Sequence, residues 1–327
     1  MVALLGALSM SAASPFLGKI GITLGDAAGV GPEVIQAALA SSKLDGKFEF
    51  RLIGDPETAH PGAPTEESAR AAVRALEEAA ELALKGEIHA VVTGPISKAR
   101  AQAVGFNFPG QTEFFAARTK TRDFAMCLTG GALTVALVTA HIPLREVADH
   151  LSVQEILRVG RLLAQFLPQR LGRKPRIAVA GLNPHAGESG ALGREEIEMI
   201  EPAVLLLRAE FGEEAEFSGP FSPDTVFHRA ASGEFDGVLC MYHDQGLIPL
   251  KLHAFDSGVN VTLGLPFPRT SPDHGTAFEI AGRQLARPES MIAAINLAAE
   301  LLTARLEAKS KLLPDANSSA ESRPDVS

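Results

Sequence analysis

Short apolar runs alternate with longer amphipathic segments along most of this chain. Runs rich in Val, Ile, Leu and Ala predict β-strands over residues 20–24, 50–53, 90–93, 133–138, 176–180, 237–241 and 260–263. Because helical patterns separate these runs, the order is typical of parallel strands joined by crossover helices. The pattern therefore predicts an α/β sandwich, with helices on both faces of one sheet.

The clearest predicted helix follows Pro64. Thr65 can cap its N-terminus, Glu66 and Glu67 place carboxylates in its first turn, and Gly86 can end it. Further helices are predicted over residues 32–39, 152–166, 194–210 and 290–306.

No low-complexity linker divides the chain, so two lobes, if present, must be interwoven. We expect residues 19–306 to form a single α/β unit, preceded by a flexible extension over 1–18. A polar, Pro- and Ser-containing C-terminus predicts a disordered tail over 307–327.

The composition narrows the class of protein. The chain has 327 residues, of which 46% are hydrophobic, and this excludes a wholly disordered protein. A formal net charge of -9 without a basic run gives no footprint for nucleic acid, and no apolar run is long enough to span a membrane. Cys127 and Cys240 lie in apolar stretches, which indicates reduced thiols and a cytoplasmic location.

Glycine-rich and polar motifs follow the predicted strands, where open α/β sheets bind their ligands. The segment GDAAGVGPE over residues 25–33 opens a helix, but its spacing is neither the dinucleotide fingerprint GxGxxG nor a P-loop. The segment TGPISK ends in Lys98. A strand-to-helix turn and a solvated lysine explain these motifs equally well.

Three histidines stand just beyond predicted strands, namely His141, His185 and His243. Imidazole is a common ligand of zinc and similar divalent metals, and catalytic sites keep three protein ligands and an open position. Neighbouring aspartates, Asp224 and Asp244 among them, could orient the imidazoles, complete the shell or move protons. Ordinary hydrogen-bonded histidines are the alternative, because the spacing alone does not define a metal site.

A second polar group lies further along the chain. Lys251, Asn260 and Arg269 combine an amine, an amide and a guanidinium, which suits a substrate that carries carboxylate or phosphate. Scattered surface cations are the alternative.

Together these motifs resemble the 4-hydroxythreonine-4-phosphate dehydrogenase family of pyridoxal 5'-phosphate biosynthesis. The resemblance is carried by ITLGDAAGVGPEV, VVTGPISK, FPGQTEFFA, VALVTAHIPL, IAVAGLNPHAGESGALGREE, GPFSPDT, MYHDQGLIPLK and VNVTLGLPFPRTSPDHGTA. It implies an isocitrate- and isopropylmalate-dehydrogenase-like α/β/α sandwich with two interwoven lobes. It also implies a homodimer with active sites at the interface, one divalent metal ion (Zn, Mg or Co), and NAD or NADP.

The resemblance also assigns residues. It implies that His141, His185 and His243 hold the metal, and it places Asp224 near that metal. In the family's GHTE motif the histidine is replaced here by Gln111, which can donate a hydrogen bond but cannot carry a positive charge. The implied substrate-binding residues are Gln111, Thr112, Lys251, Asn260 and Arg269.

The implied reaction is oxidation of 4-phosphohydroxy-L-threonine to 2-amino-3-oxo-4-(phosphooxy)butanoate, which decarboxylates to 3-amino-2-oxopropyl phosphate. The general base stays open among Lys251, Asp244, Asp224 and metal-bound water. The nearest alternative is the same chemistry on a four-carbon sugar-acid phosphate or a carboxylated ring diol. A zinc hydrolase and a non-catalytic ligand-binding relative are further alternatives.

Overall fold

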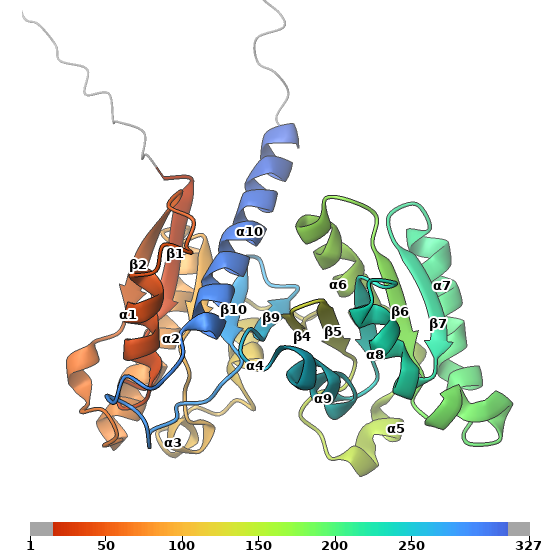
Figure 1. Ribbon diagram of the computed structural model, residues 1–327, viewed down its shortest axis with the longest axis horizontal. Coiled ribbons are helices and arrows are strands. Elements are labelled where there is room, and N and C mark those ends of the chain that lie inside the picture. Colours follow the sequence, from red (N-terminus) through yellow and green to blue (C-terminus); the bar gives the residue numbers. More distant parts are fainter. Residues whose placement is uncertain (1–15, 313–327) are drawn as a thin grey trace, which may run out of the picture.

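The computed structural model describes residues 16–312, which form one ten-stranded sheet with helices on both faces (Figure 1). The predicted α/β sandwich is therefore confirmed. Most of the predicted extension over 1–18, and the tail from residue 313 onward, lie outside the described residues. The strands are β1 Gly18–Thr23, β2 Phe48–Ile53, β3 Ala90–Thr93, β4 Ala125–Gly130, β5 Leu133–Leu137, β6 Arg176–Ala180, β7 Glu216–Phe221, β8 Gly237–Cys240, β9 Val259–Leu263 and β10 Arg269–Pro272.

The strand order is β2-β1-β3-β10-β9-β4-β5-β8-β6-β7. The four strands from β2 to β10 are mutually parallel, as are the four from β5 to β7, whereas β9 and β4 pair antiparallel with their neighbours. The chain builds β1 to β3 first, crosses to β4 to β8, and returns through β9 and β10. The two halves of the sheet are thus interwoven, as the resemblance implied.

Helices cover the two faces differently. One continuous core lies under α1, α6, α7 and α10, whereas the opposite face carries two separate cores, one under α2 and α4 and one under α8 and α9. The gap between these two cores is where polar side chains gather. The helices are α1 Gly31–Leu39, α2 Glu66–Leu84, α3 Lys98–Ala103, α4 Gln111–Arg118, α5 Val147–His150, α6 Val153–Leu171, α7 Glu201–Phe211, α8 Pro223–Ala231, α9 His243–Ala254 and α10 Glu289–Leu312.

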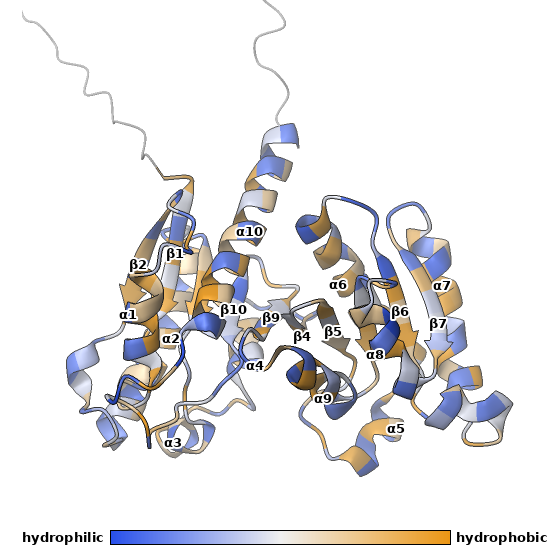
Figure 2. Ribbon diagram, in the orientation of Figure 1, coloured by the Kyte–Doolittle hydropathy of each residue, from blue (hydrophilic) through white to orange (hydrophobic). Residues whose placement is uncertain are grey.

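All seven predicted strands exist, with ends displaced by no more than two residues. Strands β4, β7 and β10 were not predicted, and neither were helices α3, α4, α5, α8 and α9. The predicted helix over 194–210 begins as a π-helical turn at Glu196–Ile200 before α7. Helix α10 continues to Leu312 rather than ending at residue 306, and its last turns are hydrophilic (Figure 2).

Helix α2 shows how local sequence fixes an element. Thr65 accepts a hydrogen bond from the Ser68 amide at 3.0 Å, and the Ser68 hydroxyl accepts one from the Thr65 amide at 3.2 Å. This capping box confirms the predicted N-cap. The helix packs mainly through small residues such as Ala72 and Ala79, while Leu84 is exposed.

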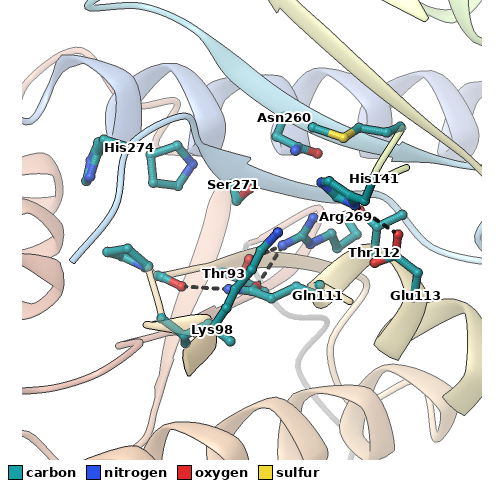
Figure 3. Close-up of a pocket in the computed structure, with 16 residues that line it drawn as sticks. Thr93, Lys98, Gln111, Thr112, Glu113, His141, Asn260, Arg269, Ser271 and His274 are labelled. Atoms are coloured by element: carbon teal, nitrogen blue, oxygen red, sulfur yellow. Dashed lines mark hydrogen bonds and ion pairs between the residues drawn. The ribbon is translucent and has the colours of Figure 1, made fainter. Parts of the chain in front are cut away.

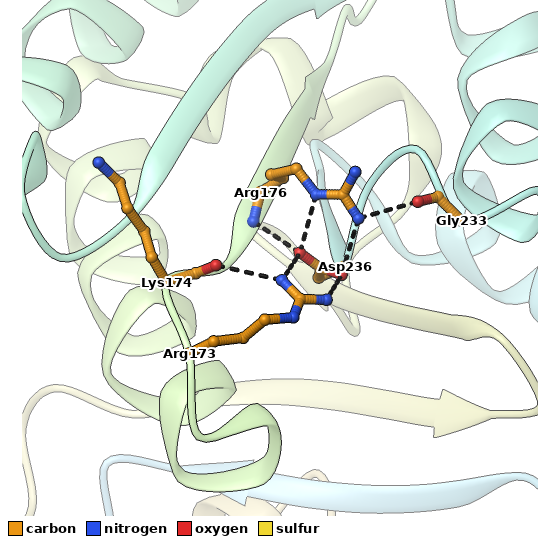
Figure 4. Close-up of polar contacts among 5 residues, drawn as sticks. All are labelled: Arg173, Lys174, Arg176, Gly233 and Asp236. Carbon is orange, nitrogen blue, oxygen red and sulfur yellow. Dashed lines mark hydrogen bonds and ion pairs between the residues drawn. The ribbon is translucent and has the colours of Figure 1, made fainter.

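Asp236 ties the start of β8 to the start of β6 (Figure 4). Its carboxylate accepts hydrogen bonds from Arg173 at 2.6 and 2.9 Å and from the Arg176 backbone amide at 2.8 Å. Burial opposes ionisation, but these donors outweigh it and hold the pKa of Asp236 well below its usual value. The cluster anchors the edge of the sheet where β6 and β8 begin.

Candidate active site

A polar pocket opens on the sheet face between the two separate cores (Figure 3). Its floor is built by alternate residues of neighbouring strands: the pairing of Ser271 with Asn260 and of Met126 with Thr262 places these side chains, together with that of Arg269, on one face. Polar residues at these positions cannot join an apolar core. They leave a cavity floored by hydrogen-bonding groups.

Arg269 is the buried cation of this floor, with only 2% of its surface exposed. Its guanidinium donates to Thr262 at 3.2 Å, to Thr93 at 2.5 Å and to Gln111 at 2.7 Å. Burial lowers the pKa of Arg269 to about 10, against the opposing effect of nearby Glu113. The group stays charged at neutral pH, so it is suited to an anionic ligand.

Gln111 and Thr112 begin α4, and the Gln111 side chain contacts Arg269. The Gln111 amide oxygen accepts from Arg269, and its amide nitrogen donates to the Gly94 carbonyl at 3.2 Å. The Thr112 hydroxyl lies 3.2 Å from that of Thr262. Four of the five predicted substrate-binding residues therefore meet in one pocket, namely Gln111, Thr112, Asn260 and Arg269.

Lys251 does not join them. It lies on α9, and its amine forms an ion pair with Asp273 at 2.8 Å. Both residues line a neighbouring hollow that shares His274 with the pocket. Within a single chain, Lys251 therefore does not line the pocket, and its substrate contact stays a prediction.

Other pocket residues were not assigned from the sequence. Lys98 and Glu113 both line the cavity, and one oxygen of Glu113 is buried without a hydrogen-bond partner. Burial raises the pKa of Glu113, but the hydrogen bond with His141, a backbone hydrogen bond and the nearby charges of His141 and Lys98 together outweigh it, and the net shift is downward. The TGPISK motif pointed to Lys98. Glu113 is the last residue of the motif that reads GQTE here, but its contact with His141, 28 residues away, has no signal in the sequence.

His141 and His243 form a pair beside the pocket. Strands β5 and β8 are adjacent and parallel, so the loops after them meet, and the two ring centroids lie 5.8 Å apart. An apolar hollow lined by Ile142, Leu144 and Tyr242 adjoins the pair. These two imidazoles are close enough to share a ligand.

His185 and Asp224 stand apart from that pair. His185 is 65% exposed at its side chain and belongs to a segment, residues 185–189, in which every φ is positive. Asp224 begins α8, where it accepts a hydrogen bond from Ser222 at 2.5 Å. Among residues 16–312 no three His, Cys, Asp or Glu side chains form a group that could hold a metal ion. One chain thus supplies two of the three predicted imidazoles at one place.

Both cysteines are buried as free thiols, and burial raises the pKa of Cys127 to about 12. In the part of the chain that the structure describes, we find no helix with the length and apolar character needed to cross a membrane. The predicted catalytic residue Asp244 lies against His243, with 2.6 Å between its carboxylate and the ring Nδ1.

Comparison with known proteins places this pocket in context. A family model described as pyridoxal phosphate biosynthetic protein PdxA matches residues 30–298. The 4-hydroxythreonine-4-phosphate dehydrogenase of Caulobacter vibrioides is 44% identical, over 88% of this chain and 98% of that protein. The D-threonate 4-phosphate dehydrogenase of Pectobacterium atrosepticum is 39% identical, over 86% of this chain and 98% of that protein.

A solved structure agrees with the sequence matches. The crystal structure of 4-hydroxythreonine-4-phosphate dehydrogenase from Klebsiella pneumoniae has a TM-score of 0.75 and 38% identity, and it covers 87% of this chain and 99% of that one. The family model and these relatives span most of the chain. The chain therefore belongs to the PdxA family of pyridoxal phosphate biosynthetic proteins.

Proposed function

We propose that this protein oxidises 4-phosphohydroxy-L-threonine with NAD or NADP and a divalent metal ion, and that the product decarboxylates to 3-amino-2-oxopropyl phosphate. The observation that carries this proposal is that the buried guanidinium of Arg269, held by hydrogen bonds, lies near the His141–His243 pair. The proposed substrate has two matching groups, an anionic end and a hydroxyl to be oxidised. Family membership supports the same reaction.

The pocket's own residues bind and orient the substrate. Arg269 offers a guanidinium held in place by three hydrogen bonds, and Lys98 adds a second cation on the facing wall. A phosphate or carboxylate bound there exchanges its hydration water for hydrogen bonds from the protein. Because these donors are already fixed in place, binding requires little reorganisation of the pocket. Thr112 and Asn260 supply neutral hydrogen-bonding groups that fix the orientation of the rest of the molecule.

The histidines fit a divalent metal in their chemistry. His141 and His243 present neighbouring imidazoles, and we propose that His185 of a second copy completes the set. When bound, the metal supplies Lewis acidity, which eases deprotonation of a substrate hydroxyl and stabilises negative charge as CO2 leaves. Lys251, Asp244 and Asp224 are the candidates for the base that takes the hydroxyl proton.

A homodimer is supported by the outer face of α9. Ile248, Leu252 and Phe255 all point outward, and Leu252 is 89% exposed. Three large apolar side chains, two on α9 and one at its C-cap, are costly to leave in water, and a second copy would cover them. We propose a cytoplasmic homodimer whose interface includes α9 and brings His185 and Asp224 of one copy to the pocket of the other.

The nicotinamide cofactor fits the hollow that borders the pocket at His274. Its walls are apolar at Val34, Ile280 and Leu285, and Arg287 adds a cation. An adenosine group and a phosphate find matching surfaces there. When bound, NAD or NADP accepts the hydride.

A second candidate substrate follows from Gln111. The family histidine at this position can add positive charge, and the glutamine cannot. A relative that carries the name D-threonate 4-phosphate dehydrogenase matches 86% of the chain. The alternative is therefore the same oxidation of a four-carbon sugar-acid phosphate, with carboxylated ring diols as a more distant option.

The test is a comparison of substrates under one set of conditions. Purified protein is given NAD or NADP, a divalent metal and either 4-phosphohydroxy-L-threonine or D-threonate 4-phosphate, and reduced nicotinamide is followed by absorbance. A higher kcat/KM for the aminated substrate supports the proposal. A higher value for the sugar acid supports the alternative, and absence of reduction with both contradicts a dehydrogenase.

A further inference from the structure

Each of the three histidines that are predicted to bind the metal has a carboxylate beside the same ring atom, Nδ1. The Nδ1 of His141 lies 3.4 Å from Glu113, that of His185 lies 3.0 Å from Glu188, and that of His243 lies 2.6 Å from Asp244. The partners come from different positions in the sequence: 28 residues away, three residues on and one residue on. The arrangement is therefore not the repeat of one local motif.

The other six histidines, all within residues 16–312, lack such a partner. The Nδ1 atoms of His150 and His274 contact backbone carbonyl oxygens, and His89 and His253 accept from backbone amides. Among the described residues, ion pairs between histidine and a carboxylate occur only at the three candidate ligands. The feature separates the predicted ligands from every other histidine.

A carboxylate beside Nδ1 has a defined chemical effect. It accepts a hydrogen bond from Nδ1–H, which fixes the tautomer, and the lone pair is then left on Nε2. Imidazoles that bind metals commonly have such a partner on the second nitrogen, which orients the ring and makes it a better donor. Two partners, Glu188 and Asp244, are well exposed, so they can be replaced without disturbing a core.

We propose that Glu113, Glu188 and Asp244 are positioning residues that hold the three histidines as Nδ1–H tautomers, so that all three bind the metal through Nε2. The inference rests on the proposed metal site and deepens it. It gives Asp244 a role through His243 rather than on the substrate, which leaves Lys251 and Asp224 as candidates for the base.

The first measurement needs no metal and no turnover. Long-range ¹H–¹⁵N correlation spectra of metal-free protein with labelled histidine distinguish the two tautomers, at a pH well above the ordinary imidazole pKa of about 6.5. We expect the Nδ1–H form for His141 and His243 in the wild type, and the Nε2–H form of His243 to grow in D244A. A predominant Nε2–H form in the wild type would overturn the proposal.

The second measurement is zinc affinity by competition with a chromogenic chelator. We expect E113A and D244A each to weaken zinc binding roughly 10- to 100-fold, with E113Q between E113A and wild type because its amide oxygen still accepts from Nδ1–H. The matched control is E198A, since Glu198 pairs with Arg194 and touches no histidine. The control should bind zinc as the wild type does.

The outcomes separate this inference from the proposed function. Wild-type protein with the expected tautomers but no zinc binding would contradict the metal site and leave the orientation of the rings established. Tight zinc binding that E113A and D244A leave unchanged would overturn the positioning role and leave the metal site standing.

Discussion

The hydrogen bond between Gln111 and Arg269 gives the most specific prediction about substrate binding. In Q111A, the Arg269 Nη2 keeps only its hydrogen bond to Thr93, because the amide oxygen that accepts its second hydrogen bond is removed. Hydrogen bonds to charged groups contribute about 1.5–3 kcal/mol net. Since 1.4 kcal/mol corresponds to a tenfold change, kcat/KM should fall roughly 10- to 150-fold.

The loss should appear mainly in KM, because Arg269 holds the anionic end of the substrate in both ground and transition states. Steady-state kinetics of NAD reduction measure it, and a thermal melt confirms that the variant is folded. The matched control is Q169A, which removes an amide that donates to the Gln165 carbonyl on α6. A kcat/KM for Q111A equal to that of Q169A would refute the reasoning.

Replacing Gln111 by the family's histidine refines the same test. A neutral imidazole offers one donor and one acceptor, which can replace the two hydrogen bonds that the Gln111 amide makes, so Q111H should be active at alkaline pH. A protonated ring cannot accept from Arg269 and is repelled by it, so its pKa should lie below the ordinary value of about 6.5. Activity of Q111H relative to wild type should therefore fall on acidification through that pKa. A pH-independent ratio would contradict this account of the Gln111–Arg269 bond.

Further predictions concern stability, charge and assembly. D236A should lower the free energy of unfolding by about 1–3 kcal/mol, measured in thermal melts. Because Arg173 and Arg176 depress the pKa of Asp236, the carboxylate stabilises the fold above about pH 4, and this stabilisation is lost below that pH. A stability deficit of D236A that is equally large at acidic pH would contradict this role of Asp236. In R269K the lysine keeps the positive charge but cannot reach the three acceptors of Arg269 at once, so kcat/KM should fall roughly 100-fold. Near-normal kinetics would disprove the role of the guanidinium geometry. L252D should give monomers in sedimentation, whereas L84D, on α2, should not; a dimer in both would exclude α9 from the interface.

Several strands that the sequence predicted, such as β3, β5 and β8, consist mainly of apolar residues and are buried along their whole length. β10, which was missed, reads RTSP, and Arg269 and Ser271 are polar because they face the pocket. β7 was not predicted because it contains Gly219 and Pro220, which are poor strand formers. At β10, polar residues that line the pocket thus interrupted the apolar pattern by which strands are recognised.

Helix α9 was missed for a related reason. It contains Gly246 and Pro249, and Ile248 and Leu252 lie on its exposed side. A helix with large apolar residues facing outward has no clear amphipathic signal in one chain. The proposed homodimer, in which a second copy covers that face, would explain this pattern.

The sequence predicted which residues belong to the candidate site better than it predicted how those residues are arranged in space. The motifs identified Gln111, Asn260 and Arg269, which do meet, whereas the contact between Arg269 and Thr93 joins residues 176 positions apart. No spacing rule reveals such a contact. The position of Lys251 beside Asp273, outside the pocket, could likewise not be predicted, because it depends on how α9 packs.

The reaction itself is tested most directly by its stoichiometry. Purified protein with 4-phosphohydroxy-L-threonine labelled at the carboxylate carbon, a divalent metal and NAD should release one CO2 for each NADH formed, and a chelator should abolish both. NADH without CO2, or turnover that survives complete removal of the metal, would contradict a metal-assisted oxidation followed by decarboxylation.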